Sequence, residues 1–132
     1  MERPDIYRIN TVMDCAPGGA GAQAEFYSQL LGWAYTHPPT EGWAAVTSPG
    51  GTVYAFQEVE GYQPPVWPWE EGKQGQMLHL DFWVAADALG QAVVYAQSIG
   101  ARLAPVQYYK GSRTLLDPAG HPFCIDTDLP ED

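Results

Sequence analysis

The sequence has few basic residues. Lys and Arg together number 6 in 132 residues, Asp and Glu number 16, and the formal net charge is −10. Nucleic-acid binding requires a basic surface that displaces counterions, and attraction to anionic membranes requires the same sign of charge. We therefore expect neither nucleic acid nor a membrane as partner. The acidity favours solubility and does not identify a ligand.

Long apolar runs and cysteines are also scarce. No apolar stretch follows residues 1–5, so we expect no secretory signal, and no run approaches the length of a membrane span. Two cysteines, Cys15 and Cys124, are too few to staple a domain of this size. Reduced thiols are the default in the cytoplasm. We therefore predict a cytoplasmic protein and, from its length, a single domain over residues 1–132.

Two stretches of the first half recur in the second half. Residues 24–32 reappear as residues 92–100, with Ala, Tyr, Gln and Gly at matching positions and an offset of 68 (92 − 24). Residues 46–56 reappear as residues 115–125, with an offset of 69 between Pro118 and Pro49 (118 − 49). Two echoes at nearly one offset indicate a duplicated supersecondary unit. We expect the active or binding site between the two halves.

Local patterns predict strand–helix–strand–strand–strand twice. In the first module, about residues 5–60, the elements expected are a strand in 6–15, a helix over 22–31 closed by Gly32, and strands over 33–36, 43–47 and 53–58. In the second, about residues 77–128, they are a strand over 77–84, a helix capped by Asp87 and running to about 99, and strands near 102–108, 111–116 and 123–127. A linker of about residues 61–76 joins the modules. Each half leaves an apolar sheet face uncovered, so the halves must join.

Four segments carry a family resemblance: residues 26–33 (FYSQLLGW), 78–82 (LHLDF), 100–102 (GAR) and 117–123 (DPAGHPF). Together they resemble the vicinal oxygen chelate superfamily, which includes glyoxalases, bleomycin resistance proteins and dioxygenases. The resemblance implies an α+β fold of two pseudo-symmetric βαβββ modules, with mixed sheets curled around a cleft and the helices outside. It also implies a homodimer. It does not fix a reaction, because members include lyases, isomerases, dioxygenases and drug-binding proteins.

Metal-dependent members of that superfamily place His or Glu ligands at four equivalent strand positions, two in each module. The resemblance maps these positions onto Asn10 (Thr11 if the alignment shifts by one), Ala55 (Gln57 in a shifted register), His79 and Cys124. Oxygen-rich metal sites prefer carboxylates, and zinc would accept His79 and Cys124 but needs two more ligands. We therefore predict no complete metal site and no cofactor.

Alternation along the strand that opens the second module places His79, Asp81 and Trp83 on one face. Cys124 and Asp126 of the last strand are expected beside them, with Arg113 in the same cleft. Such a pocket suits a small, flat, partly polar organic molecule. The candidate ligand-binding residues are Asn10, Trp43, Gln57, Trp67, Trp69, His79, Trp83, Arg113, Cys124 and Asp126.

The main function predicted is metal-independent binding of a small organic molecule. The alternative is a lyase or isomerase in which Asp81 orients His79 for general-base work, with or without an atypical metal. A structural ion pair of Asp81, with Arg113 as one partner, is the plainer interpretation. Trp67 and Trp69 in the linker either cover a ligand, cover a subunit interface or pack in the core.

Overall fold

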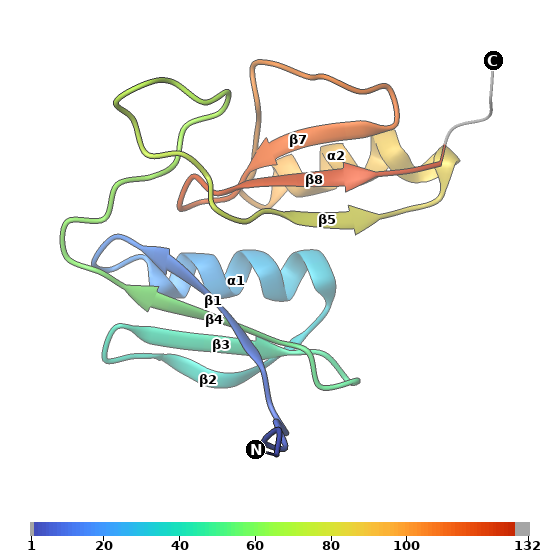
Figure 1. Cartoon of the computed structure of the whole chain (residues 1–132). Coiled ribbons are helices and arrows are strands. Elements are labelled where there is room, and N and C mark those ends of the chain that lie inside the picture. The colour runs from blue at the N-terminus through green and yellow to red at the C-terminus, as the bar shows by residue number, and fades with distance from the viewer. Residues whose placement is uncertain (1, 129–132) are drawn as a thin grey trace. The chain divides into compact units, whose positions relative to one another are not determined.

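The computed structural model describes residues 2–128 and divides into two compact units at the boundary between Tyr62 and Gln63 (Figure 1). The first unit contains β1 (Asn10–Cys15), α1 (Ala20–Leu31), β2 (Ala34–Thr40), β3 (Trp43–Thr47) and β4 (Val53–Glu58). The second contains β5 (Leu80–Trp83), the short 3₁₀ helix η1 (Ala86–Ala88), α2 (Leu89–Ser98), β6 (Arg102–Leu103), β7 (Ser112–Leu116) and β8 (Pro122–Asp126).

Each unit has one four-stranded mixed sheet. The strand order is β1-β4-β3-β2 in the first and β5-β8-β7-β6 in the second. β1 runs parallel to β4 and β5 runs parallel to β8, whereas the other pairs are antiparallel. In Figure 1 each helix lies along one face of its own sheet. The predicted α+β fold of two βαβββ modules is confirmed; a cleft shared by the two modules stays a prediction.

One offset relates three of the four strands of the first sheet to their counterparts in the second. Thr11 pairs with Tyr54 as Leu80 pairs with Phe123, an offset of 69 (80 − 11, 123 − 54). The same offset relates the pair Ala45–Ala55 to the pair Thr114–Cys124. The sequence echo is therefore a structural duplication in which the residues of β1, β3 and β4 have counterparts 69 positions later, whereas β2 and β6 are related by an offset of 68 (102 − 34).

The hairpin turns repeat at the same offset. The hydroxyl of Ser48 accepts the N–H of Thr52 at 2.9 Å, and the carboxylate of Asp117 accepts the N–H of His121 at 3.0 Å. The Asp117 carboxylate also accepts the N–H of Ala119, and its side chain is fully buried. The same turn is thus closed by a hydroxyl in one unit and by a buried carboxylate in the other.

Aromatic packing under α1 forms the core of the first unit. Phe26 and Tyr27 are buried, and the Tyr27 ring stacks on Phe56 with centroids 5.6 Å apart. Tyr54 meets the Tyr27 ring edge-on, and burial raises the pKa of its hydroxyl. Gly32 ends the helix at φ 72°, as predicted, because glycine adopts this left-handed conformation without a Cβ clash.

Several predicted boundaries in the second unit are wrong. β5 begins at Leu80 rather than at 77, and Leu78, which the predicted strand included, is exposed. β8, the partner of β5, begins at Pro122, and the equivalent residue of the first unit is Val53. Proline has no N–H to donate to a hydrogen bond between strands. Asp87 lies within η1, and no side chain caps α2 at Ala88.

β6 is also much shorter than predicted, because a side chain replaces the strand backbone. The amide nitrogen of Gln107 donates to the carbonyl of Thr114 at 2.9 Å, and the amide oxygen of Gln107 accepts the N–H of Thr114 at 2.8 Å. These two bonds satisfy the β7 edge beyond Leu103, where the sequence predicted a continuing strand. Likewise, β1 begins at Asn10 rather than at 6.

The paired turns give a test of the buried carboxylate. Asp117→Ala removes the buried carboxylate that accepts the partly buried N–H groups of Ala119 and His121, so we expect it to lower the free energy of unfolding by about 1–3 kcal/mol. Ser48→Ala removes one bond at a partly exposed turn and should cost less. Urea denaturation followed by circular dichroism measures both variants. Equal losses of unfolding free energy in the two variants would show that burial of the Asp117 carboxylate does not strengthen its contribution to the turn.

Candidate functional site

The second sheet has one apolar and one polar face. Leu115, Phe123 and Ile125 are buried on the side that α2 covers. Alternation places the neighbouring residues of the same strands on the opposite side. We call that side the open face; it carries His79, Asp81, Trp83, Thr114, Cys124 and Asp126, together with Arg102, Ser112, Leu116 and Pro122. Trp83 is exposed there, whereas Asp126 is buried.

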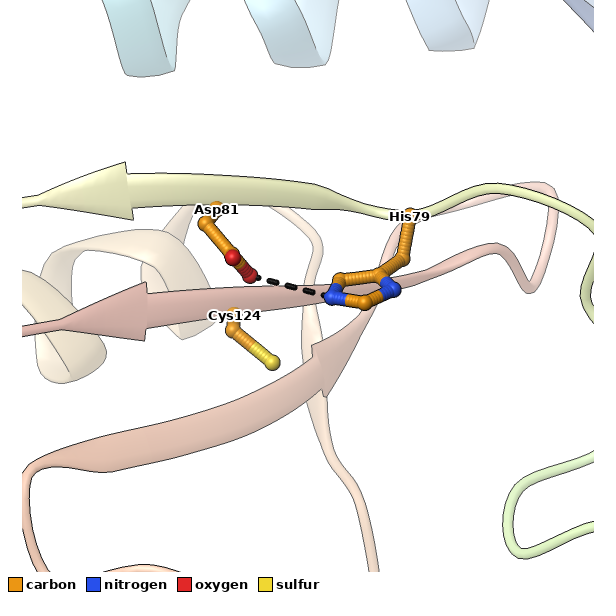
Figure 2. Close-up of side chains that lie close together, drawn as sticks. All are labelled: His79, Asp81 and Cys124. Atoms are coloured by element: carbon orange, nitrogen blue, oxygen red, sulfur yellow. Dashed lines mark ion pairs between the residues drawn. The ribbon is translucent and has the colours of Figure 1, made fainter.

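Three side chains of the open face converge, as Figure 2 shows. The Nε2 atom of His79 lies 3.2 Å from Oδ1 of Asp81, and both side chains are nearly half exposed. Asp81 is the register partner of Cys124 on the adjacent parallel strand. One ligand atom from each of the three residues lies within 4.8 Å of the other two. We call these three residues the His79–Asp81–Cys124 cluster.

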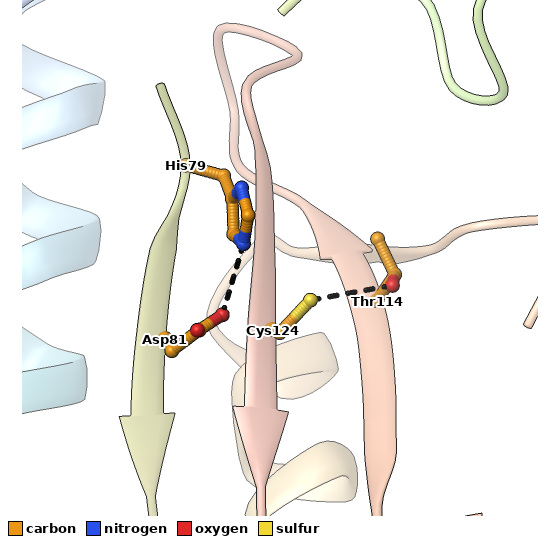
Figure 3. Close-up of polar contacts among 4 residues, drawn as sticks. All are labelled: His79, Asp81, Thr114 and Cys124. Carbon is orange, nitrogen blue, oxygen red and sulfur yellow. Dashed lines mark hydrogen bonds and ion pairs between the residues drawn. The ribbon is translucent and has the colours of Figure 1, made fainter. Parts of the chain in front are cut away.

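The thiol of the cluster has a polar neighbour that the sequence analysis missed. The hydroxyl of Thr114 lies 3.4 Å from the Cys124 sulfur (Figure 3). Thr114 is the antiparallel register partner of Cys124 on β7 and is buried. Its position follows from the duplication, because its counterpart 69 residues earlier, Ala45, pairs with Ala55. The repeat offset therefore contained the signal that could have found it.

Arg113 does not share this face, so that prediction is wrong. Its register partner is Ile125, which lies on the helix-covered side. Its guanidinium donates to the backbone carbonyls of Tyr109, Lys110 and Ser112 at 3.3, 3.2 and 2.8 Å. The alternation rule already implied this, because Leu115, two residues along, is buried under the helix. The partner of Asp81 is His79.

The predicted residues of the first unit lie on the matching face of their own sheet. The amide oxygen of Asn10 accepts a hydrogen bond from Arg8 at 3.0 Å. Trp43 and Gln57 are register partners, and Trp43 packs on a small apolar cluster of Ala45, Val53 and Ala55. Whether these residues act together with His79 stays a prediction.

The linker tryptophans belong to the second unit. The indole N–H of Trp67 donates to the carbonyl of Val106 at 3.1 Å, and its ring meets Tyr108 edge-on. Trp69 is exposed and lies against Gly75, where a Cβ would come within 2.9 Å of the indole ring. Trp67 thus ties the linker to the segment after β6, which favours the packing interpretation for this residue.

The four positions that the resemblance assigned to a metal do not form a donor set. The observed register makes Ala55 the counterpart of Cys124 and Asn10 the counterpart of His79. Ala55 is fully buried and its methyl group has no donor atom, while Asn10 offers only a neutral amide. Divalent ions in oxygen-rich sites require more carboxylate than this. The residues at these positions therefore do not fit the superfamily's metal.

Comparisons with known proteins agree with the duplicated fold. Residues 10–125 match the family described as Glyoxalase-like domain. A glyoxalase/bleomycin resistance protein/dioxygenase family enzyme from Burkholderia phytofirmans PsJN is similar, with a TM-score of 0.67, 21% identity, and coverage of 91% of this chain and 97% of that one. A glyoxalase-related enzyme from Fulvimarina pelagi is also similar, with a TM-score of 0.63, 18% identity, and coverage of 93% of this chain and 89% of that one.

The fosfomycin resistance protein FosX from Listeria monocytogenes is also similar, with a TM-score of 0.61, 11% identity, and coverage of 97% of this chain and 96% of that one. Identities this low show a shared fold and leave activity open. No curated protein matches the sequence. Within residues 2–128 no helix is long and apolar enough to cross a membrane.

Proposed function

Because the chain belongs to the glyoxalase-like domain family of the vicinal oxygen chelate superfamily, we propose that it binds a small, flat organic molecule on the open face. The observation that supports this most is the meeting of an imidazole, a carboxylate and a thiol beside an exposed indole. Binding sites combine apolar or aromatic surface with a few convergent polar groups. The site is proposed to work without the superfamily's four-position metal.

Charge favours a cationic ligand over an anionic one. The chain carries a formal net charge of −10, and the Asp81 carboxylate on the open face is nearly half exposed. Of the two arginines on strands of this unit, Arg113 lies on the other face. Arg102 pairs with Leu116 and so lies on the open-face side, but on β6, at the opposite edge of the sheet from Asp81. The indole of Trp83 adds an aromatic surface that attracts cations, and a carboxylate forms stronger hydrogen bonds with a charged donor. A planar organic cation with N–H donors therefore matches this face best.

Ligand binding can be tested by tryptophan fluorescence on protein stripped of metal and kept in chelator. We expect planar organic cations to quench the emission saturably and matched organic anions to have no effect. Asp81→Asn should weaken cation binding about tenfold or more, because it removes a charge-assisted hydrogen bond. Trp83→Phe should remove most of the quenching.

Asp87→Asn is the matched control, because Asp87 is an exposed carboxylate of η1 outside the open face. It should leave the affinity unchanged. Equal binding of anions and cations, or an affinity unaffected by Asp81→Asn, would contradict the proposed ligand class.

A second candidate, a lyase or isomerase, is supported by the contact between His79 and Asp81. When Nε2 of His79 carries the proton that Asp81 accepts, Nδ1 is left as the basic nitrogen. A neutral imidazole held in this way can remove a proton from a carbon next to a carbonyl group. In this alternative His79 is the general base and Asp81 positions it.

The enzymatic candidate predicts solvent deuterium exchange at carbons adjacent to a carbonyl, measured by NMR on small ketones and hydroxyaldehydes. We expect His79→Gln to lower the exchange rate by about 10²–10⁴-fold, the usual contribution of a general base. His37→Gln, on β2 of the first unit, should leave the rate unchanged. Absence of exchange above the uncatalysed rate would exclude this candidate and leave the binding function.

We also propose a homodimer and a cytoplasmic location. Neither cysteine forms a disulfide within the described residues, which suits a reducing compartment. Exposed apolar side chains that a second copy can cover occur in both units, including Ile6, Tyr7 and Ile9 before β1 and Val94 and Tyr95 on α2.

Sedimentation equilibrium tests the dimer. We expect a mass twice that of one chain, with Val94→Lys shifting the equilibrium toward monomer because it places a charge on the exposed apolar surface of α2. The control variant Gln91→Lys, at an exposed position of the same helix, should leave the monomer–dimer equilibrium unchanged. A monomer over the whole concentration range would contradict the dimer.

A further inference from the structure

We propose that the His79–Asp81–Cys124 cluster binds a thiophilic divalent cation of the Zn²⁺ class within the second unit alone. The three residues supply an imidazole nitrogen, a carboxylate oxygen and a sulfur, which are the donor types that zinc takes in proteins. The site goes beyond the proposed binding of an organic molecule and does not depend on it.

The distances are close to those that a tetrahedral ion requires. Zinc bonds of about 2.0–2.3 Å separate two ligands of a tetrahedron by roughly 3.5 Å. Nε2 of His79 and Oδ1 of Asp81 are already 3.2 Å apart, and all three ligand atoms lie within 4.8 Å of one another. All three side chains are partly exposed, and the proposal requires their rotation to bring Cys124 to the ion.

This donor set differs from the four positions that the superfamily resemblance assigned. It adds Asp81, two residues after His79 on the same strand, and needs nothing from the first unit. The duplication supplies an internal comparison, because the counterparts 69 positions earlier are Asn10, Val12 and Ala55. The same backbone geometry in the first unit thus carries no imidazole, carboxylate or thiol at these three positions.

The surroundings also suit a metal ion that is bound by a thiolate and has one open coordination position. Thr114 lies 3.4 Å from the Cys124 sulfur, so its hydroxyl can donate to the thiolate and orient it. As the metal–sulfur bond forms, the thiol S–H bond breaks and its proton passes to solvent. Three protein ligands on an exposed face leave the fourth position to water, an arrangement found in reactive zinc sites.

Cobalt is the probe, because Co²⁺ takes the zinc geometry and absorbs visible light. Chelator-stripped, reduced protein is titrated with Co²⁺ in the absence of any organic ligand. We expect saturation at one ion per chain, tetrahedral visible bands, and a thiolate-to-cobalt charge-transfer band that Zn²⁺ abolishes by displacement. Cys124→Ser should remove the charge-transfer band, while His79→Gln and Asp81→Asn should each weaken binding at least about tenfold.

Each variant has a control of the same residue type elsewhere in the chain: Cys15→Ala, His37→Gln and Asp87→Asn. These three should retain the band and the affinity, and circular dichroism confirms that all six variants are folded. No saturable Co²⁺ binding by the folded, reduced protein would overturn the proposal, as would a charge-transfer band that survives Cys124→Ser.

The outcome is separable from that of the proposed function. Organic-cation binding is measured in chelator, whereas Co²⁺ binding is measured without an organic ligand. Co²⁺ bound through Cys124 with no organic cation bound supports the metal site and contradicts the proposed function. The reverse result supports the proposed function and contradicts the metal site.

Discussion

The parallel pairing of β5 with β8 determines the chemistry that the second unit can perform. It places Asp81 opposite Cys124 and Trp83 opposite Asp126. Because side chains alternate across a sheet, a slip of one residue in β5 would move Asp81 and Trp83 to the side that α2 covers. The contact between the Phe82 and Phe123 rings, with centroids 5.8 Å apart, opposes such a slip. Packing on the covered face thereby sets the arrangement of groups on the open face.

The two units share one backbone arrangement but have different side chains on the sheet face opposite the helix. At equivalent positions the first unit has Val12 and Ala55 where the second has Asp81 and Cys124. In the first unit Trp43 packs over small apolar side chains on this face, whereas in the second the face carries a partly exposed imidazole and carboxylate. The helix-covered sides, by contrast, are apolar in both units. The core therefore constrains both copies alike, while the other face is free to differ between them.

The sequence predicted the fold well because the repeat shows which residues of the two halves are equivalent. Local periodicity cannot show this, since it describes one segment at a time. The offset of 69 relates Ala45 to Thr114 and Ala55 to Cys124, and the pair Ala45–Ala55 in the first sheet recurs as the pair Thr114–Cys124 in the second. Local periodicity was less reliable at β6, where the side chain of Gln107 substitutes for strand backbone. No composition or periodicity rule anticipates such a replacement, since it depends on the path of the loop that presents the amide.

The candidate site was predictable only in part for a related reason. Alternation grouped His79, Asp81 and Trp83 correctly, because they lie on one strand. The assignment of Arg113 to the cleft failed because its strand position places it with Ile125 on the side that α2 covers. The guanidinium instead binds three carbonyls of the neighbouring turn, so its charge leaves the covered face. Position on the strand determines the face on which this side chain begins.

Asp81 links the proposals for the open face, because each of them uses its carboxylate. An organic cation binds it directly, a metal ion takes it as a ligand, and the enzymatic alternative uses it to hold His79 in place. A carboxylate oxygen that coordinates an ion is less available to an organic cation, and the ion's charge repels that cation as well. The metal ion and an organic cation should therefore exclude one another at this face. A neutral or anionic molecule with an oxygen or sulfur donor can instead occupy the ion's fourth position. Occupancy of the cluster by a metal would thus reverse the charge preference of the site.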